Sequence, residues 1–173
     1  MIGLRLTIEK DAWRRVAHII SDETYARLTG DKGYFDTKIV YISESGPANE
    51  RKKRLAIMDQ DGENHQFLTN GNFLVLTPRF SPSTQEITYL AYYNNEPRVY
   101  IFNLQTGEQE LLGSFPGMTF APRFSPDGNR IIMSYSNKGV TDIYEMDLKS
   151  QNLKRLTNNP SIDTSPSFSP NGK

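Results

Sequence analysis

The stretch Pro78-Arg79-Phe80-Ser81-Pro82 decides the fold, because it returns at a fixed interval. It recurs as Pro122-Arg123-Phe124-Ser125-Pro126 and, with one change, as Pro166-Ser167-Phe168-Ser169-Pro170, so that each copy lies 44 residues after the previous one. A second marker keeps this spacing, since the apolar segments 55–59, 99–103 and 143–147 all end in Asp or Asn. Two markers at one period indicate a structural repeat.

Each repeat has the composition of short β-strands. Residues 86–93 are rich in β-branched and aromatic side chains, and both of their alternating faces are largely apolar, so the strand needs cover on both sides. Turn sequences separate the strands, most clearly Ser125-Pro126-Asp127-Gly128. We therefore predict blades of four strands: an inner strand at Phe-Ser-Pro, two middle strands, and an outer strand such as 152–156. A β-sandwich with coincidental turn spacing is the alternative.

The number of repeats predicts a mainly β fold in the form of a partial β-propeller. Residues 38–173 hold about three units, and closed propellers have about four blades or more. The first unit has no Phe-Ser-Pro strand, and the last contributes only an inner strand. We expect a fragment with open sheet edges that favour self-association.

Residues 1–37 have a different character and read as the remnant of an α/β domain. Trp13, Val16, Ala17 and Ile20 are spaced as one apolar face of a helix. The segment 21–23 predicts a helix end and a new start, with a second short helix that stops at Gly30. Residues 3–8 are expected to form a strand.

The composition excludes several kinds of chemistry. Twenty basic and 20 acidic residues give a formal net charge of zero, which argues against nucleic-acid binding, and no apolar run is long enough to cross a bilayer. There is no cysteine, and His18 and His65 are the two histidines, so thiolate and multi-histidine metal sites are ruled out. No Gly-x-Ser-x-Gly motif is present. We expect no cofactor, no metal and no catalysis.

Three local features have plain structural interpretations. The acidic segment 59–63 lacks the alternating ligands of an EF-hand and predicts a hairpin turn. The basic cluster 51–54 lies near Glu44 and Glu50 and fits a solvated hairpin loop. His18 is expected to be a packing residue.

The loops that lead into the inner strands are the candidate binding surface. They cover residues 71–77, 115–121 and 160–165, which meet at one mouth of the ring. Their apolar side chains either bind a protein partner or seal the blade junctions. These side chains are Phe73, Met118, Phe120 and Ile162.

The 44-residue repeat resembles that of the TolB family of β-propellers. The same type of repeat also occurs in the propellers of prolyl-oligopeptidase-like enzymes. The resemblance rests on the Phe-Ser-Pro-(Asp/Asn)-Gly type units, on the segment 143–148 and on Leu153-Lys154-Arg155-Leu156-Thr157. The head segments 14–23, 28–30 and 33–41 resemble the junction between the small domain and the propeller of this family. Such propellers have six blades, so about three are present here.

The resemblance implies a non-enzymatic periplasmic scaffold of the Tol-Pal system. Its expected partners are the Pal lipoprotein, which would tie it peripherally to the outer membrane, and Tol proteins such as TolA. The expected roles are outer-membrane integrity and cell division. Met118, Ala121 and Thr164 match Pal-contacting positions, although Met118 replaces a frequent histidine. The full candidate set is Met118, Thr119, Phe120, Ala121, Ile162, Asp163 and Thr164.

With half a ring, the chain alone should bind Pal weakly or not at all, and a sub-micromolar affinity would contradict this. Two other functions stay open. The chain could be the propeller that gates a prolyl-oligopeptidase-like serine peptidase. It could also be a carbohydrate-binding propeller in which Tyr92, Tyr93 and Tyr100 stack on sugars, although core positions explain these tyrosines better.

Overall fold

The computed structural model describes residues 12–115 and 119–172, which form a helix followed by β-strands. The chain divides into two compact units, residues 1–39 with 57–66 and residues 40–56 with 67–173. The elements are α1 (Trp13–Thr29), β1 (Lys38–Ser45), β2 (Lys52–Asp59), β3 (Gln66–Phe67), β4 (Leu74–Phe80), β5 (Glu86–Tyr93), β6 (Glu96–Asn103), β7 (Gln109–Ser114), β8 (Thr119–Phe124), β9 (Arg130–Asn137), β10 (Val140–Asp147) and β11 (Leu153–Arg155).

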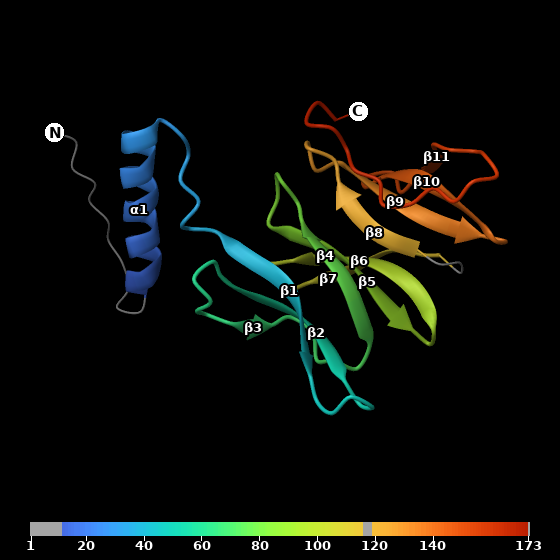
Figure 1. Cartoon of the computed structure of the whole chain (residues 1–173), viewed down its shortest axis with the longest axis horizontal. Helices are drawn as coiled ribbons and strands as arrows, with labels where there is room; N and C mark the ends of the chain where they lie inside the picture. The colour runs from blue at the N-terminus through green and yellow to red at the C-terminus, as the bar shows by residue number, and fades with distance from the viewer. Residues whose placement is uncertain (1–11, 116–118, 173) are drawn as a thin grey trace. The chain divides into compact units, whose positions relative to one another are not determined.

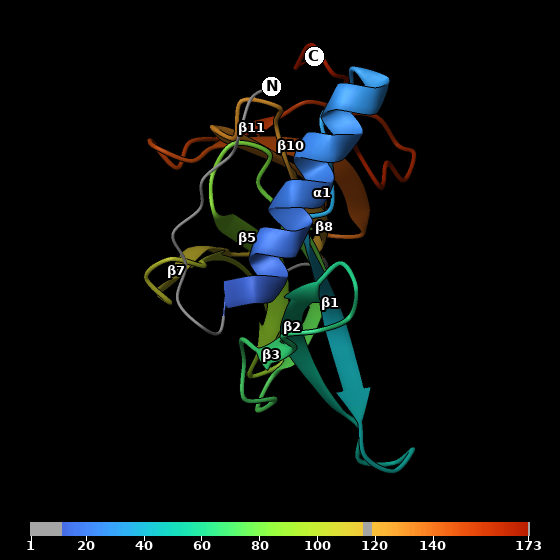
Figure 2. The ribbon, with the colours of Figure 1, turned by 90° about the vertical axis from the view of Figure 1, so that its left-hand side faces the viewer.

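Helix α1 is one continuous helix, so the predicted break at residues 21–23 is wrong (Figures 1 and 2). The hydroxyl of Ser21 does not cap a new helix, because it donates to the carbonyl of Ala17 within the same helix, at 2.9 Å. The predicted stop at Gly30 is confirmed. Gly30 has φ 82°, and its N–H donates to the carbonyl of Ala26. The strand expected at residues 3–8 lies outside the described residues.

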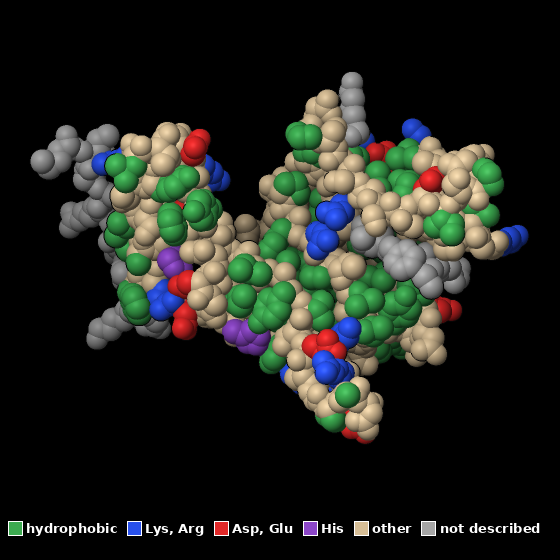
Figure 3. All heavy atoms as spheres, viewed as in Figure 1, with side chains coloured by type: hydrophobic (Ala, Val, Ile, Leu, Met, Phe, Trp, Pro, Cys, Tyr) green, Lys and Arg blue, Asp and Glu red, His purple; other side chains and the backbone are tan. Residues whose placement is uncertain are grey.

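The apolar face predicted for α1 is exposed rather than packed. Trp13 is 60% exposed and Ile20 is 52% exposed, and Figure 3 shows apolar side chains at the surface of this helix. The opposite, polar face turns toward the rest of its unit. Of the helices in the described part of the chain, none is both long and apolar enough to cross a membrane.

The sheets have the strand order of propeller blades. One has the order β4-β5-β6-β7, the next β11-β10-β9-β8, and all of their strand pairs are antiparallel (Figure 1). Each is a four-stranded meander, as predicted. Among residues 12–115, the remaining sheet has three strands in the order β1-β2-β3, and no inner strand precedes β1.

The 44-residue period is visible in the backbone. Strands β2, β6 and β10 begin at residues 52, 96 and 140. The turn after each inner strand closes in the same way, because the N–H of Ser81 donates to Glu86 and that of Ser125 to Arg130, both at 2.8 Å. The type I turn predicted at 125–128 is confirmed, since the N–H of Gly128 donates to the carbonyl of Ser125 at 2.9 Å.

Two apolar cores join neighbouring sheets face to face. Strand β5 lies between them and is buried on both faces, as its sequence predicts. Tyr89 and Ala91 pack in one core and Leu90 in the other. The first core holds Val40, Ile42, Leu55, Leu68, Val75, Tyr89, Ala91, Tyr100, Phe102 and Leu104. The second holds Leu76, Leu90, Tyr92, Val99, Ile101, Leu112, Phe115, Phe124, Ile131, Met133, Tyr135, Met146 and Leu148.

The third Phe-Ser-Pro copy does not form the predicted inner strand. Residues 161–172 have no strand assignment in the structure. The reason is that in β4 and β8 the inner strand pairs with the strand that follows it, and the described chain provides no such strand after residue 170. The turn of this copy still forms, with the N–H of Gly172 donating to Ser169.

Candidate functional site

The predicted binding mouth lies in the second unit, where the chain enters the inner strands. Met118 lies outside the described residues. Thr119, Phe120 and Ala121 start strand β8, and the backbone of Thr119 pairs with Tyr135 and that of Phe120 with Ser134. The side chains of these three residues are not among those that the structure describes. Their backbone therefore belongs to a blade, at the edge where β8 begins.

The other predicted segment is fixed to the same blade. Asp163 donates its N–H to the carbonyl of Thr141 at 2.9 Å, and its carboxylate accepts a hydrogen bond from Asn159 at 2.9 Å. The N–H of Ser165 donates to the hydroxyl of Ser134 at 3.0 Å. Ile162 is 73% exposed and Thr164 is also exposed. Because the backbone of β8 pairs with Ser134 as well, the two predicted segments meet at strand β9.

The inner strands share an irregular step at this mouth. Thr77 and Ser165 are equivalent in the repeat, and both have positive φ, 49° and 57°. The pairing of β4 with β5 shifts between Leu76 and Arg79, and the pairing of β8 with β9 shifts in the same place. Non-glycine residues with positive φ are uncommon, and bulges often lie beside functional sites, where they redirect a loop. The positive φ and the register shift therefore recur at equivalent positions of the repeat, next to the loops of the mouth.

Phe73 lies in the loop that leads into the inner strand of the preceding blade. It is 44% exposed, and its ring packs against Tyr93 with 5.1 Å between centroids. The guanidinium of Arg98 lies over the other ring of this pair, 4.6 Å from the centroid of Tyr93. Beside them is a cavity of about 380 Å³ with aromatic and amide walls. Phe73 thus packs against its blade through Tyr93, and the exposed part of its ring could contact a partner.

The tyrosines considered for sugar stacking have separate roles. Tyr92 packs against a core. Tyr100 stacks on the buried Tyr89, with 5.6 Å between centroids and 21° between planes, and both line the cavity together with Tyr93. Burial raises the pKa of the Tyr89 hydroxyl, and the nearby Tyr100 raises it further. Two of the three therefore serve blade packing first.

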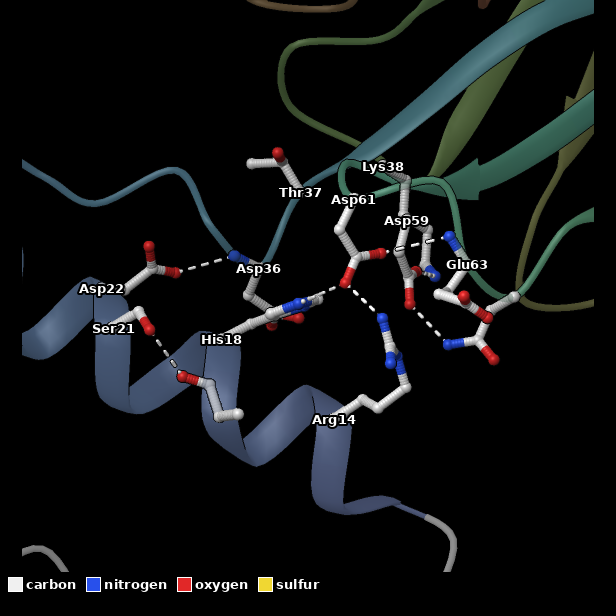
Figure 4. Close-up of polar contacts among 12 residues, drawn as sticks. Arg14, His18, Ser21, Asp22, Asp36, Thr37, Lys38, Asp59, Asp61 and Glu63 are labelled. Carbon is white, nitrogen blue, oxygen red and sulfur yellow. Dashed lines mark hydrogen bonds and ion pairs between the residues drawn. The ribbon is translucent and has the colours of Figure 1, made fainter.

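A polar cluster in the first unit links α1 to the loop after β2 (Figure 4). Arg14 donates to Asp61 at 2.5 Å, and His18 Nε2 lies 3.1 Å from the same carboxylate oxygen. The Glu63 N–H lowers the pKa of Asp61 most, and the side chains of His18 and Arg14 lower it further against partial desolvation. Asp61 is thus held as a carboxylate first by its own turn and then by the helix. We call these three side chains, Arg14, His18 and Asp61, the helix clasp.

The same face of α1 holds the following loop through Asp22. Its two carboxylate oxygens accept the N–H groups of Phe35 at 2.6 Å and Asp36 at 3.0 Å. A Cβ on Gly33 would lie 2.3 Å from Asp22 Oδ1, so this close approach needs a glycine.

The acidic segment 59–63 is the hairpin turn that its sequence predicts. The carboxylate of Asp59 accepts hydrogen bonds from Lys38 at 2.6 Å and from Asn64 at 2.5 Å. The N–H of Gly62 donates to the carbonyl of Asp59. Burial raises the pKa of Asp59, but the hydrogen bonds from Lys38 and Asn64 outweigh this and lower it overall. The carboxylates of Asp59 and Asp61 are therefore occupied by cationic and amide groups.

The helix clasp is the feature that the sequence prediction missed. His18 is 14% exposed, but it contacts a carboxylate instead of packing in an apolar face. Arg14, His18 and Asp22 are spaced four residues apart, which places them on one side of a helix. That polar stripe was a usable signal, although nothing in the sequence names Asp61 as its partner.

Comparison with known proteins places this geometry in a family. The profile of the TolB beta propeller domain matches residues 25–173. The chain is 66% identical over 120 residues to the Tol-Pal system protein TolB of Paramagnetospirillum magneticum, which covers 69% of this chain and 27% of that protein. The chain therefore spans about a quarter of the length of this relative.

Solved structures agree with the match. The crystal structure of TolB from Acinetobacter baumannii superposes with a TM-score of 0.86 at 35% identity, covering 97% of this chain and 42% of that one. An acylaminoacyl peptidase of Pyrococcus horikoshii superposes with a TM-score of 0.53 at 10% identity, over 69% of this chain and 23% of that one. At such low identity, the second likeness concerns the fold alone.

Proposed function

The chain belongs to the TolB β-propeller family, and from that membership we propose that it is a protein-interaction scaffold of the Tol-Pal system with no catalysis of its own. Its location would be the periplasm, and its roles would be outer-membrane integrity and cell division. Residues 1–37 would belong to the preceding α/β domain and residues 38–173 to the propeller.

We take the Pal lipoprotein as the partner at the propeller mouth, which would associate the protein peripherally with the outer membrane. The observation that carries this proposal is Ile162, a large apolar side chain 73% exposed on a segment that hydrogen bonds fix to strands β9 and β10. An apolar anchor on a preorganised backbone is typical of binding hot spots, because little conformational freedom remains to be lost. TolA would communicate with the N-terminal region rather than with this mouth.

The proposal is tested by titrating soluble Pal against the chain in a surface plasmon resonance experiment. We expect weak binding, with a dissociation constant above ~10 µM, because the chain supplies only part of a ring. Replacing Ile162→Asp should weaken this binding about tenfold, which corresponds to the loss of one apolar anchor.

The matched control is Leu153→Asp, which places the same charge on an exposed leucine of the outer strand β11. This variant should bind like the unmodified chain. Equal affinities for Ile162→Asp and Leu153→Asp would rule out the mouth as the contact surface. No response at ~1 mM Pal would contradict the proposal that this part of the propeller mouth contacts Pal by itself.

A further inference from the structure

The three copies of the repeated motif surround one cavity at the other end of the inner strands. The cavity has a volume of about 370 Å³ and is lined by Arg79, Phe80, Pro82, Arg123, Phe124, Pro126, Ser167, Phe168, Ser169 and Pro170. Strand β4 enters from the mouth loop and ends at Phe80, and β8 ends in the same way at Phe124. The cavity is therefore a separate site from the mouth. We call it the motif cavity.

Two arginines at equivalent repeat positions give the motif cavity a positive charge. Arg79 and Arg123 both line it, and within residues 12–115 and 119–172 neither makes an ion pair. Arg79 donates to the carbonyl of Pro78 at 2.8 Å. The Nε of Arg123 is buried and has no hydrogen-bond partner among the described residues. Buried donors without acceptors are costly, so a ligand that accepts from these groups gains affinity.

Phenylalanine and proline side chains form most of the remaining wall, beside Ser167 and Ser169, and the turns that carry them are held in place. The hydroxyl of Ser83 donates to the carbonyl of Asp127 at 3.1 Å, which ties the first motif turn to the second. Arg130 donates to the carbonyl of Gly172 at 3.2 Å and lies 5.3 Å from the ring centroid of Phe168, which ties the third motif to the second blade. The three turns therefore present phenylalanine and proline side chains on a fixed frame.

We propose that the motif cavity binds a carboxylate that is attached to an apolar group, such as an acidic or C-terminal residue of a peptide. Arginine forks match the planar geometry of a carboxylate through paired N–H donors. The phenylalanine and proline walls take up the apolar part, and a volume of about 370 Å³ lies in the range of small-ligand pockets. No carboxylate belongs to the lining, so charge complementarity selects an anion.

The probe is N-acetyl-phenylalanine, titrated into the isotope-labelled chain and followed by amide NMR shifts. Its neutral amide, N-acetyl-phenylalaninamide, has the same ring and size without the charge. We expect the acid to shift signals of residues 78–82, 122–126 and 166–170 and to bind at least about tenfold more tightly than the amide. This comparison uses the unmodified chain and is independent of any effect of mutation on folding.

Variants then locate the binding groups. Arg79→Gln and Arg123→Gln should each weaken binding of the acid about tenfold, and the double variant should abolish it. The matched control is Arg51→Gln, which removes an exposed arginine in the β1–β2 loop and should change nothing. The proposal fails if acid and amide bind equally, if the double variant binds like the unmodified chain, or if inorganic phosphate binds more tightly than the acid.

Discussion

Gly128 shows how one residue joins two repeats. It has φ 74°, and a Cβ there would lie 2.0 Å from the hydroxyl of Ser83, which donates to the adjacent Asp127 carbonyl. Gly107 has almost the same φ, 73°, with no atom within 4 Å of an added Cβ. A comparison of substitutions at the two glycines therefore distinguishes the cost of backbone strain from the cost of a steric clash.

We predict that Gly107→Ala lowers the free energy of unfolding by about 1 kcal/mol, the cost of a non-glycine residue at positive φ. Gly128→Ala should cost about 2 kcal/mol, because Ser83 must also rotate and lose its hydrogen bond. Urea denaturation followed by circular dichroism measures both. In a Ser83→Ala background most of the excess cost of Gly128→Ala should disappear, because only Ser81 Oγ at 3.1 Å and the Cβ of residue 83 at 3.3 Å then remain close to the added Cβ. An excess as large as in the unmodified background would disprove the steric explanation.

Single residues were predictable where one backbone conformation requires them. The roles of Gly30 as a helix stop and of Gly62 and Gly128 in turns follow from local rules on positive φ. The pairing of His18 with Asp61 could not be predicted, because it joins residues 43 positions apart. The prediction that His18 is a packing residue was wrong for that reason.

At the scale of elements, helix α1 is held to its unit by ion pairs as well as by the packing of Tyr25 against Tyr34 and Phe35. The helix has no fully buried residue, and Trp13 and Ile20 of the apolar face predicted from the sequence are exposed. Periodicity identified a helix but not which side faces inward. The helix clasp decides that side, because Arg14 and His18 reach Asp61.

The helix clasp predicts a pH-dependent stability for α1. The pKa of Asp61 is lowered in the folded chain by the Glu63 N–H and by His18 and Arg14. A lowered carboxylate pKa stabilises the fold above the unfolded value of about 4, and this contribution is lost as pH falls through the lower folded value. Amide hydrogen exchange in α1 should therefore be slower at pH 7 than in Asp61→Asn, with the difference fading below about pH 4.

The matched control for this test is Asp31→Asn, which removes an exposed carboxylate just beyond the same helix. It should leave the exchange of α1 unchanged at every pH. Equal exchange rates in Asp61→Asn and the unmodified chain at pH 7 would show that the helix clasp does not hold the helix.

At the scale of the whole molecule, the period of 44 residues predicted the blades because each copy contains its own turn and strand signals. The order of strands and the burial of β5 on both faces follow from it. The third motif departs from the pattern, since a strand needs a partner and sequence identity cannot supply one. The motif cavity could not be predicted either, because it requires the three copies of the motif, 44 residues apart, to converge in space.

Open sheet edges make self-association the last prediction. Strand β11 is the outer edge of its sheet, Leu153 is exposed on it, and the exposed Leu156 follows it directly. Unpaired edge strands with apolar side chains pair readily with other chains, and a lysine on the edge opposes this. We expect the sedimentation coefficient of the chain to rise with concentration and Leu153→Lys with Leu156→Lys to suppress the rise. Leu28→Lys, on an exposed helix position, is the control and should leave it intact. A coefficient independent of concentration, or equal suppression by Leu28→Lys, would show that the β11 edge does not drive association.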